Sequence, residues 1–329
     1  MGDVANPNRG RPRGRRPPAW LLAAAACALA AAAWGGSGIG LNVLHGSAEP
    51  WAGPDACADG PCTVRFMAYN IQWGLGADGV HDLDRIAAVL RRADADVVVL
   101  TEVDVNWRRS GNVHQPAYLA AAAGYPHWFF GASLTTWASG NARLSHYGNL
   151  LLSRFPIVRA QTVRLPRPWG REPRSLLLAD IVIGGRQVTV AGTHLGLNRQ
   201  ERLAQAARIR EWAAHGVQPR TQEADADDPI VILMGDFNAP PSSPEITLLT
   251  GGPAGLIDAH ADVPGAGGTF PYPEPSARID YIFVSENVAH RVVAAGALSV
   301  PGSDHLPVTA DIAWPQQDAR PLASASGSR

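Results

Sequence analysis

The sequence predicts a mixed α/β sandwich, and three features of the chain support this fold class. Runs of β-branched and apolar residues typical of strands recur along the chain, and amphipathic helical patterns lie between them. Two of the runs are separated by a short turn around Gly184 and Gly185, which is the spacing of a β-hairpin. Strands that alternate with helices early in the chain, together with such hairpins, are expected of a mixed α/β sandwich.

Eight segments are predicted to be strands because each is a short run of β-branched and apolar residues. In chain order they are 64–69, 97–100, 149–152, 176–183, 188–191, 230–234, 279–284 and 308–312.

Two segments have the spacing of amphipathic helices. The first is expected to begin near Asp82, whose carboxylate suits the positive end of a helix. The apolar stripes are Leu83, Ile86, Ala87 and Leu90 in the first segment, and Leu203, Ala206, Ala207, Ile209 and Trp212 in the second.

The predicted elements fall within one large domain, because residues 63–315 contain neither a linker nor a repeat. Within this domain, the acidic stretch 215–229 is predicted to be a surface loop. The polar, Ser-rich and Ala-rich segment 316–329 is predicted to be a disordered tail.

The N-terminal region has the pattern of a membrane-targeting segment. Residues 1–18 carry five Arg and one acidic residue and form a predicted basic cytoplasmic tail, and 19–44 is an apolar segment rich in Ala and Leu. This order predicts a cleaved signal peptide or a transmembrane anchor, with a buried soluble helix as the third alternative. Residues 45–62 are predicted to be a linker, in which Cys57 and Cys62 either close a small disulfide loop or remain free thiols.

The charge of the chain argues against binding nucleic acid through its overall field. All 28 basic residues are Arg, and without the two predicted tails, the apolar segment and the linker the large domain, residues 63–315, has 21 Arg against 24 acidic residues, a net charge of about −3. Two local patches remain as candidates for substrate contact. One is an Arg-rich loop, for which the alternative interpretation is a solvated hairpin tip. The other is an aromatic run, for which the alternative is ordinary core packing. They consist of Arg164, Arg167, Trp169, Arg171 and Arg174, and of Tyr125, Trp128, Phe129, Phe130 and Trp137.

Polar residues that follow or interrupt the strand-like runs are the candidates for chemistry. Amide and carboxylate oxygens are hard ligands suited to Mg²⁺, and an imidazole is suited to proton transfer or hydrogen bonding. Taken singly, each residue could serve only to cap a loop or to satisfy the core. Together the eight residues predict a site assembled by folding: Asn70, Glu102, His194, Asp236, Asn238, Asp280, Asp304 and His305.

The order of the motifs resembles the endonuclease/exonuclease/phosphatase superfamily, which includes DNase I-like nucleases, sphingomyelinases and inositol polyphosphate phosphatases. The resemblance covers about 64–313, and one departure is Thr101, where many relatives carry Gln. It rests on Tyr-Asn70-Ile, Thr-Glu102, Thr-His194-Leu, Gly-Asp236-Phe-Asn238, Arg-Ile-Asp280-Tyr-Ile and Ser-Asp304-His305-Leu-Pro-Val. It implies a four-layered α/β sandwich, DNase I-like, with two packed mixed sheets flanked by helices.

The resemblance also implies roles for the site residues. A divalent metal, Mg²⁺ or Mn²⁺ in its place, would be held chiefly by Glu102, with help from Asn70 and Asp304. His194 and Asn238 would donate hydrogen bonds to phosphoryl oxygens. Asp280 would orient His305, and either His305 or Asp236 would activate water. Asn149, in a predicted turn with Tyr147 and Gly148, either faces the cleft or bonds its own backbone.

The predicted function is that of a metal-dependent phosphodiesterase or phosphatase acting outside the cytoplasmic membrane. It is expected to be membrane-anchored or secreted, as a monomer, and a phospholipid-type or other small phosphodiester is favoured over DNA. The alternatives are an exported DNase I-like endonuclease and a catalytically silent, membrane-tethered binding module.

Overall fold

The computed structural model describes residues 44–47, 57, 62–137, 143–215, 229–252, 255–263 and 267–314, which belong to a compact unit beginning at Leu41. The predicted cytoplasmic tail, almost all of the predicted signal or anchor, most of the linker and the C-terminal tail lie outside the described residues. Among the helices that are described, none has the length and apolar content needed to cross a membrane.

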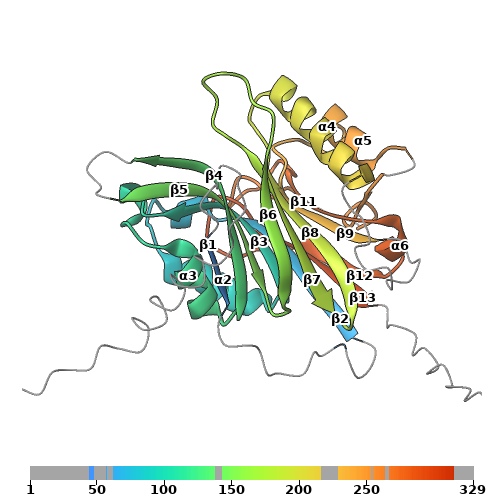
Figure 1. Ribbon diagram of the computed structural model, residues 1–329, viewed down its shortest axis with the longest axis horizontal. Helices are drawn as coiled ribbons and strands as arrows, with labels where there is room; N and C mark the ends of the chain where they lie inside the picture. Colours follow the sequence, from blue (N-terminus) through green and yellow to red (C-terminus); the bar gives the residue numbers. More distant parts are fainter. Residues whose placement is uncertain are drawn as a thin grey trace, which may run out of the picture. The chain divides into compact units, whose positions relative to one another are not determined.

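The described strands form two sheets (Figure 1). The first has seven strands in the order β1-β4-β5-β3-β2-β13-β12, and its central pair, β2 and β3, is parallel. The second has six strands in the order β10-β11-β9-β8-β7-β6, and its central pair, β8 and β9, is also parallel. The first sheet comprises β1 (Leu44–Ser47), β2 (Cys62–Asn70), β3 (Val97–Val105), β4 (His127–Trp137), β5 (Leu144–Ser153), β12 (Val292–Ala297) and β13 (Val308–Trp314). The second comprises β6 (Ile157–Arg164), β7 (Ser175–Ile183), β8 (Arg186–His194), β9 (Ile230–Asp236), β10 (Ile257–Asp258) and β11 (Asp280–Val284).

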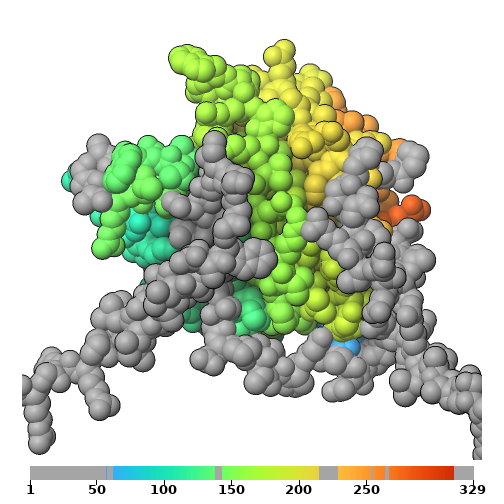
Figure 2. Space-filling model, in the orientation of Figure 1, coloured from blue at the N-terminus to red at the C-terminus, as the bar shows by residue number. Residues whose placement is uncertain are grey.

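Alternation of side chains along the strands builds four layers. In β2, Phe66 lies in the core between the sheets, whereas Met67 points to the opposite face and packs with the helices α2 (Leu83–Ala93) and α3 (Gln115–Ala123). In β9, Ile232 likewise lies between the sheets. Leu233 packs on the other face with α4 (Arg199–His215) and α5 (Pro244–Thr250). The predicted four-layered sandwich is therefore confirmed, and α4, yellow in Figure 2, lies on the surface of the molecule.

Both predicted helices are present, and the first begins where it was expected, whereas in the second the predicted apolar stripe is only partly buried because Ala207 is exposed. Asp82 is the N-cap of α2, and its Oδ1 accepts a hydrogen bond of 3.0 Å from the backbone nitrogen of Arg85. The second stripe lies on α4, where Ala206 and Ile209 are buried. The remaining short elements are α6 (Glu286–Ala289) and the 3-10 turns η2 (Gln72–Gly74) and η3 (Arg108–Ser110).

Several elements were not predicted, because the strands among them are interrupted by Gly or polar residues and the helices are short. Strand β4 contains the aromatic run apart from Tyr125, which precedes it, and Phe129 and Phe130 are core residues while Trp137 is exposed. The predicted turn at Tyr147-Gly148-Asn149 is wrong, because these residues lie inside β5, paired with β3 and β4. β6 and β12 are largely exposed. Helix α3 is short and rich in Ala, and α5 is also short and begins with Pro.

Part of the predicted linker is structured. Residues 44–47 pair antiparallel with β4, and Cys57 forms a disulfide with Cys62 at the start of β2. The disulfide expected as one of two alternatives is therefore present.

Candidate active site

The register of the second sheet brings three predicted site residues into one row. His194 is the last residue of β8 and lies opposite Asp236 at the end of β9, and Asp236 lies opposite Asp280 at the start of β11. The close approach of β8 and β9 requires Gly235, since a Cβ there would lie 1.9 Å from the carbonyl oxygen of Thr193 and its φ is +142°.

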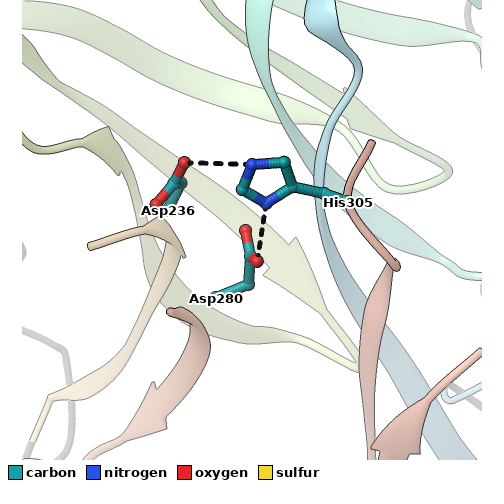
Figure 3. A group of neighbouring side chains, drawn as sticks. All are labelled: Asp236, Asp280 and His305. Atoms are coloured by element: carbon teal, nitrogen blue, oxygen red, sulfur yellow. Dashed lines mark hydrogen bonds and ion pairs between the residues drawn. The ribbon is translucent and has the colours of Figure 1, made fainter. Parts of the chain in front are cut away.

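His305 connects this row to the loop that precedes β13 (Figure 3). Its Nδ1 lies 2.8 Å from Asp280 Oδ2, and its Nε2 lies 3.8 Å from Asp236 Oδ2. Burial lowers the pKa of His305, but the charge and hydrogen bond of Asp280, with the charges of Asp236 and Asp304, raise it to about 10. The imidazole is therefore held as a cation between two carboxylates at neutral pH.

Asp236 is the centre on which the donors of the site converge. Its Oδ2 accepts a hydrogen bond from Asn70 Nδ2 at 3.0 Å, and it also lies 3.4 Å from His194 Nε2. Burial and the charge of Asp280 raise the pKa of Asp236 to about 7, against the opposing effect of His305. A carboxylate with a pKa near neutrality is suited to accept a proton from water.

Asn70 and Glu102 come from the parallel pair in the first sheet. A bulge interrupts the pairing of β3 with β5 between Leu100 and Val103, and Glu102 has a positive φ of 59°, rare for a residue other than Gly. This backbone turns the carboxylate toward Asn70, whose Nδ2 donates to Glu102 Oε1 at 3.1 Å. Burial, with the charge of Asp304, raises the pKa of Glu102.

The orientation of Asn70 differs from its predicted role as a metal ligand. Its Oδ1 accepts a hydrogen bond from the backbone nitrogen of Gln72 at 3.0 Å, and its nitrogen faces Glu102 and Asp236. In this arrangement the Asn70 amide nitrogen links the two carboxylates, and the amide oxygen is directed to the backbone of Gln72 rather than to the carboxylates.

The other predicted residues lie around the same centre. Asn238 has a positive φ of 49°, its backbone nitrogen donates to Asp236 Oδ1 at 2.8 Å, and its Nδ2 donates to the carbonyl of Leu195 at 3.0 Å. Asp304 precedes His305, and its charge raises the pKa values of both Glu102 and His305. All eight predicted residues are thus at or beside one site.

Asn149 is placed differently from the two roles considered for it. Its Nδ2 donates across the sandwich to the carbonyl of Ser175 in β7, at 3.1 Å. Asn149 therefore connects the two sheets.

The residues fit a divalent cation. Glu102, Asp236, Asp280 and Asp304 supply four carboxylates, against the cations Arg174 and His305, and Asp280 Oδ1 is buried without a hydrogen-bond partner among the described residues. Asp236, Asp280 and His305 also place one potential ligand atom each within 4.8 Å of one another. The hydrogen bond to Asp280 occupies His305 Nδ1, which is therefore not free to bind a metal. A hard cation prefers oxygen ligands, and the carboxylates of Glu102 and Asp304 are more accessible than those of Asp236 and Asp280.

Arg174 is a site residue that the sequence did not reveal. It belongs to the predicted Arg-rich loop, whose Trp169 is fully exposed, but Arg174 is buried and its Nη1 lies 2.9 Å from His194 Nδ1. The loop therefore contains both a solvated tip and one residue of the site. The spacing of the Arg residues carries no signal that separates them.

A cluster of three aromatic rings around Arg109 was also not predicted. The Arg109 guanidinium lies 5.1–5.3 Å from the ring centres of Trp73, Trp107 and Tyr147, and Arg109 pairs with the buried Asp104. The charge of Glu102 acts on Arg109. The Asp104 carboxylate two positions after Glu102 was the available signal.

A two-sheet sandwich with carboxylates and imidazoles gathered at the strand ends defines a class of phosphoester-cleaving hydrolases. Residues 67–305 match the model of the Endonuclease/Exonuclease/phosphatase family, and the chain belongs to this family. Its members are phosphoesterases or nucleases, and they typically depend on a divalent metal. The superfamily and fold inferred from the motifs are confirmed.

Three known proteins illustrate the likeness. The uncharacterized protein YbhP of Escherichia coli is 30% identical over 261 residues, which cover 76% of this chain and 96% of YbhP. An endonuclease/exonuclease/phosphatase structure from Beutenbergia cavernae is 30% identical, with a TM-score of 0.61 over 76% of this chain and 71% of that one. A mannosyl-6-phosphatase of Bacteroides thetaiotaomicron shares the fold at 18% identity, with a TM-score of 0.55 over 75% of this chain and 98% of that one.

Proposed function

We propose that the protein is a Mg²⁺-dependent phosphodiesterase or phosphatase that acts outside the cytoplasmic membrane. The observation that carries the proposal is the convergence of Asn70 Nδ2, His194 Nε2 and His305 Nε2 on Asp236 Oδ2, at 3.0, 3.4 and 3.8 Å. The two longer distances exceed a hydrogen bond, so each ring nitrogen remains free to donate to an oxygen of the substrate or to water.

In this proposal Asp236 orients the attacking water and accepts its proton. The imidazolium of His305, fixed by Asp280, and the ring of His194 donate to the phosphoryl oxygens as negative charge develops on them. Asn238 has a second amide hydrogen beyond the one bonded to Leu195, and it is the third donor.

Glu102 and Asp304 would hold the metal, with Asn70 fixing the Glu102 carboxylate. When bound, Mg²⁺ would supply Lewis-acid stabilisation of charge on the phosphoryl and leaving oxygens. Mn²⁺ could be bound by the same carboxylate oxygens in place of Mg²⁺.

A small phosphodiester is favoured as the substrate over DNA because the catalytic domain has a net charge of about −3. The test compares initial rates of the full chain on bis(p-nitrophenyl) phosphate, p-nitrophenyl phosphate, sphingomyelin, phosphatidylinositol and plasmid DNA. His305→Ala serves as the control for contaminating enzymes in each assay. Rates at least about tenfold higher on a small diester than on DNA are expected from the charge, and efficient His305-dependent cleavage of plasmid alone would favour the endonuclease.

The location outside the membrane is supported by the order of basic tail and apolar segment, and by the Cys57–Cys62 disulfide. Protease added to intact bacterial cells that produce the full chain is expected to digest the catalytic domain once the outer barrier is permeabilised. Protection until the cytoplasmic membrane is lysed would contradict the location and leave the chemistry untouched.

A further inference from the structure

Arg174 and His194 make a buried contact whose direction can be deduced. Arg174 Nη1 lies 2.9 Å from His194 Nδ1, and both side chains are buried. A guanidinium has only donors, so His194 Nδ1 must accept with its lone pair. The ring is therefore neutral and carries its proton on Nε2.

The surroundings of His194 would otherwise leave the proton's position open. Nδ1 lies 4.0 Å from Glu102 Oε1, and Nε2 lies 3.4 Å from Asp236 Oδ2, so each nitrogen has a carboxylate that would attract a proton. Arg174 removes this ambiguity by placing a donor at Nδ1 alone.

Arg174 is itself held in place. Its Nη1 lies 2.8 Å from Glu172 Oε1, and its guanidinium also hydrogen-bonds to the Tyr147 side chain. These contacts come from Tyr147 in β5 and from Glu172 in the loop between β6 and β7, so the donor is held from two parts of the chain.

We propose that Arg174 is a positioning residue that fixes His194 as the neutral tautomer protonated at Nε2, so that His194 presents a hydrogen-bond donor to the phosphoryl group. The catalytic part of this inference rests on the proposed hydrolase function.

The test reads the tautomer directly by ¹⁵N NMR of the full chain, with the His194 signals assigned by comparison with His194→Gln. In the wild-type protein Nε2 is expected to show the shift of a protonated ring nitrogen, and Nδ1 that of an unprotonated one. In Arg174→Met the two shifts are expected to move toward each other, and in Arg174→Lys, which keeps a donor, to stay closer to the wild-type values. Arg171→Met, the same change at an exposed residue of the same segment, is expected to change neither.

The activity of the same variants separates this inference from the proposed function. Arg174→Met is expected to lower kcat by about 10²-fold, with little change in KM, as the loss of one fixed donor to the transition state does. A wild-type spectrum with the proton on Nδ1, or unchanged shifts in Arg174→Met, overturns the inference even if the enzyme is active. The wild-type spectrum decides this even if the Met variant fails to fold, and absent hydrolysis with the expected spectra would overturn only the proposed function.

Discussion

The substitution Asp280→Asn tests whether the charge next to His305 matters for turnover. The variant keeps the size of the side chain but removes the carboxylate that lies 2.8 Å from His305 Nδ1. A pKa of about 10 instead of 6.5 corresponds to about 5 kcal/mol in favour of the imidazolium, shared between Asp280, Asp236 and Asp304. If Asp280, which makes the hydrogen bond, supplies about half of this, the variant loses roughly 2–3 kcal/mol of that preference, which lowers the pKa of His305 by about 2 pH units and the rate at the alkaline end of the profile by up to about 10²-fold.

The direction of the pH dependence follows from the raised pKa. The imidazolium is present below the pKa, so on the alkaline side the wild-type rate is expected to fall only as the pH rises toward about 10, whereas the fall on the acid side, near pH 7, belongs to Asp236. In Asp280→Asn this alkaline limb is expected to move down by about 2 pH units. The assay is the rate of bis(p-nitrophenyl) phosphate hydrolysis at saturating Mg²⁺ between about pH 6 and about pH 10. Asp311→Asn, at a carboxylate paired with Arg65, is the control, and an Asp280→Asn variant with wild-type kcat and an unmoved limb would refute the reasoning.

Three further predictions concern stability, measured by urea unfolding. Asp104→Ala leaves Arg109 without its fully buried partner and is expected to lower the free energy of unfolding by about 2–4 kcal/mol. The control Glu211→Ala, at an exposed pair with Arg208, is expected to change it by less than about 0.5 kcal/mol. Equal effects of the two substitutions would contradict the role of the Asp104 pair. Although burial raises the pKa of Asp258, hydrogen bonds from His260 and Arg278 lower it to about 2. The Asp258 carboxylate therefore contributes roughly 2 kcal/mol to the free energy of unfolding above pH 3.8, and this contribution is lost as the pH falls through about 2. Asp258→Asn should flatten the acid side of the stability profile, and an unchanged profile would count against this. Gly235→Ala is expected to cost more than about 2 kcal/mol because the new Cβ would meet Thr193 O at 1.9 Å, and a neutral effect would show that β8 and β9 can separate.

Much of the fold could be predicted because its central strands are largely apolar. β2 and β9 are buried on both faces, so their composition alone identifies them. β6 and β12 could not be found in this way, since both are largely exposed and their positions depend on the strands they pair with.

The candidate site divides in a similar manner. Residues such as Asp236 and His305 could be predicted because each stands in a short motif next to a strand end. Arg174 could not, because its importance comes from burial against His194, and nothing local distinguishes it from the exposed Arg171. The orientation of the Asn70 amide depends on the backbone turn at Gln72, which the sequence alone does not specify.

The central claim, metal-dependent phosphoester hydrolysis at the Glu102 site, is tested most directly by one rate measurement. The full chain, freed of metal by EDTA and gel filtration, is assayed on bis(p-nitrophenyl) phosphate before and after Mg²⁺ is added, beside Glu102→Gln. Mg²⁺ is expected to restore the wild-type rate from background by more than about 10²-fold, and Glu102→Gln is expected to recover little of it at the same Mg²⁺ concentration. Full activity of the metal-free wild type, or equal restoration in Glu102→Gln, would contradict the claim.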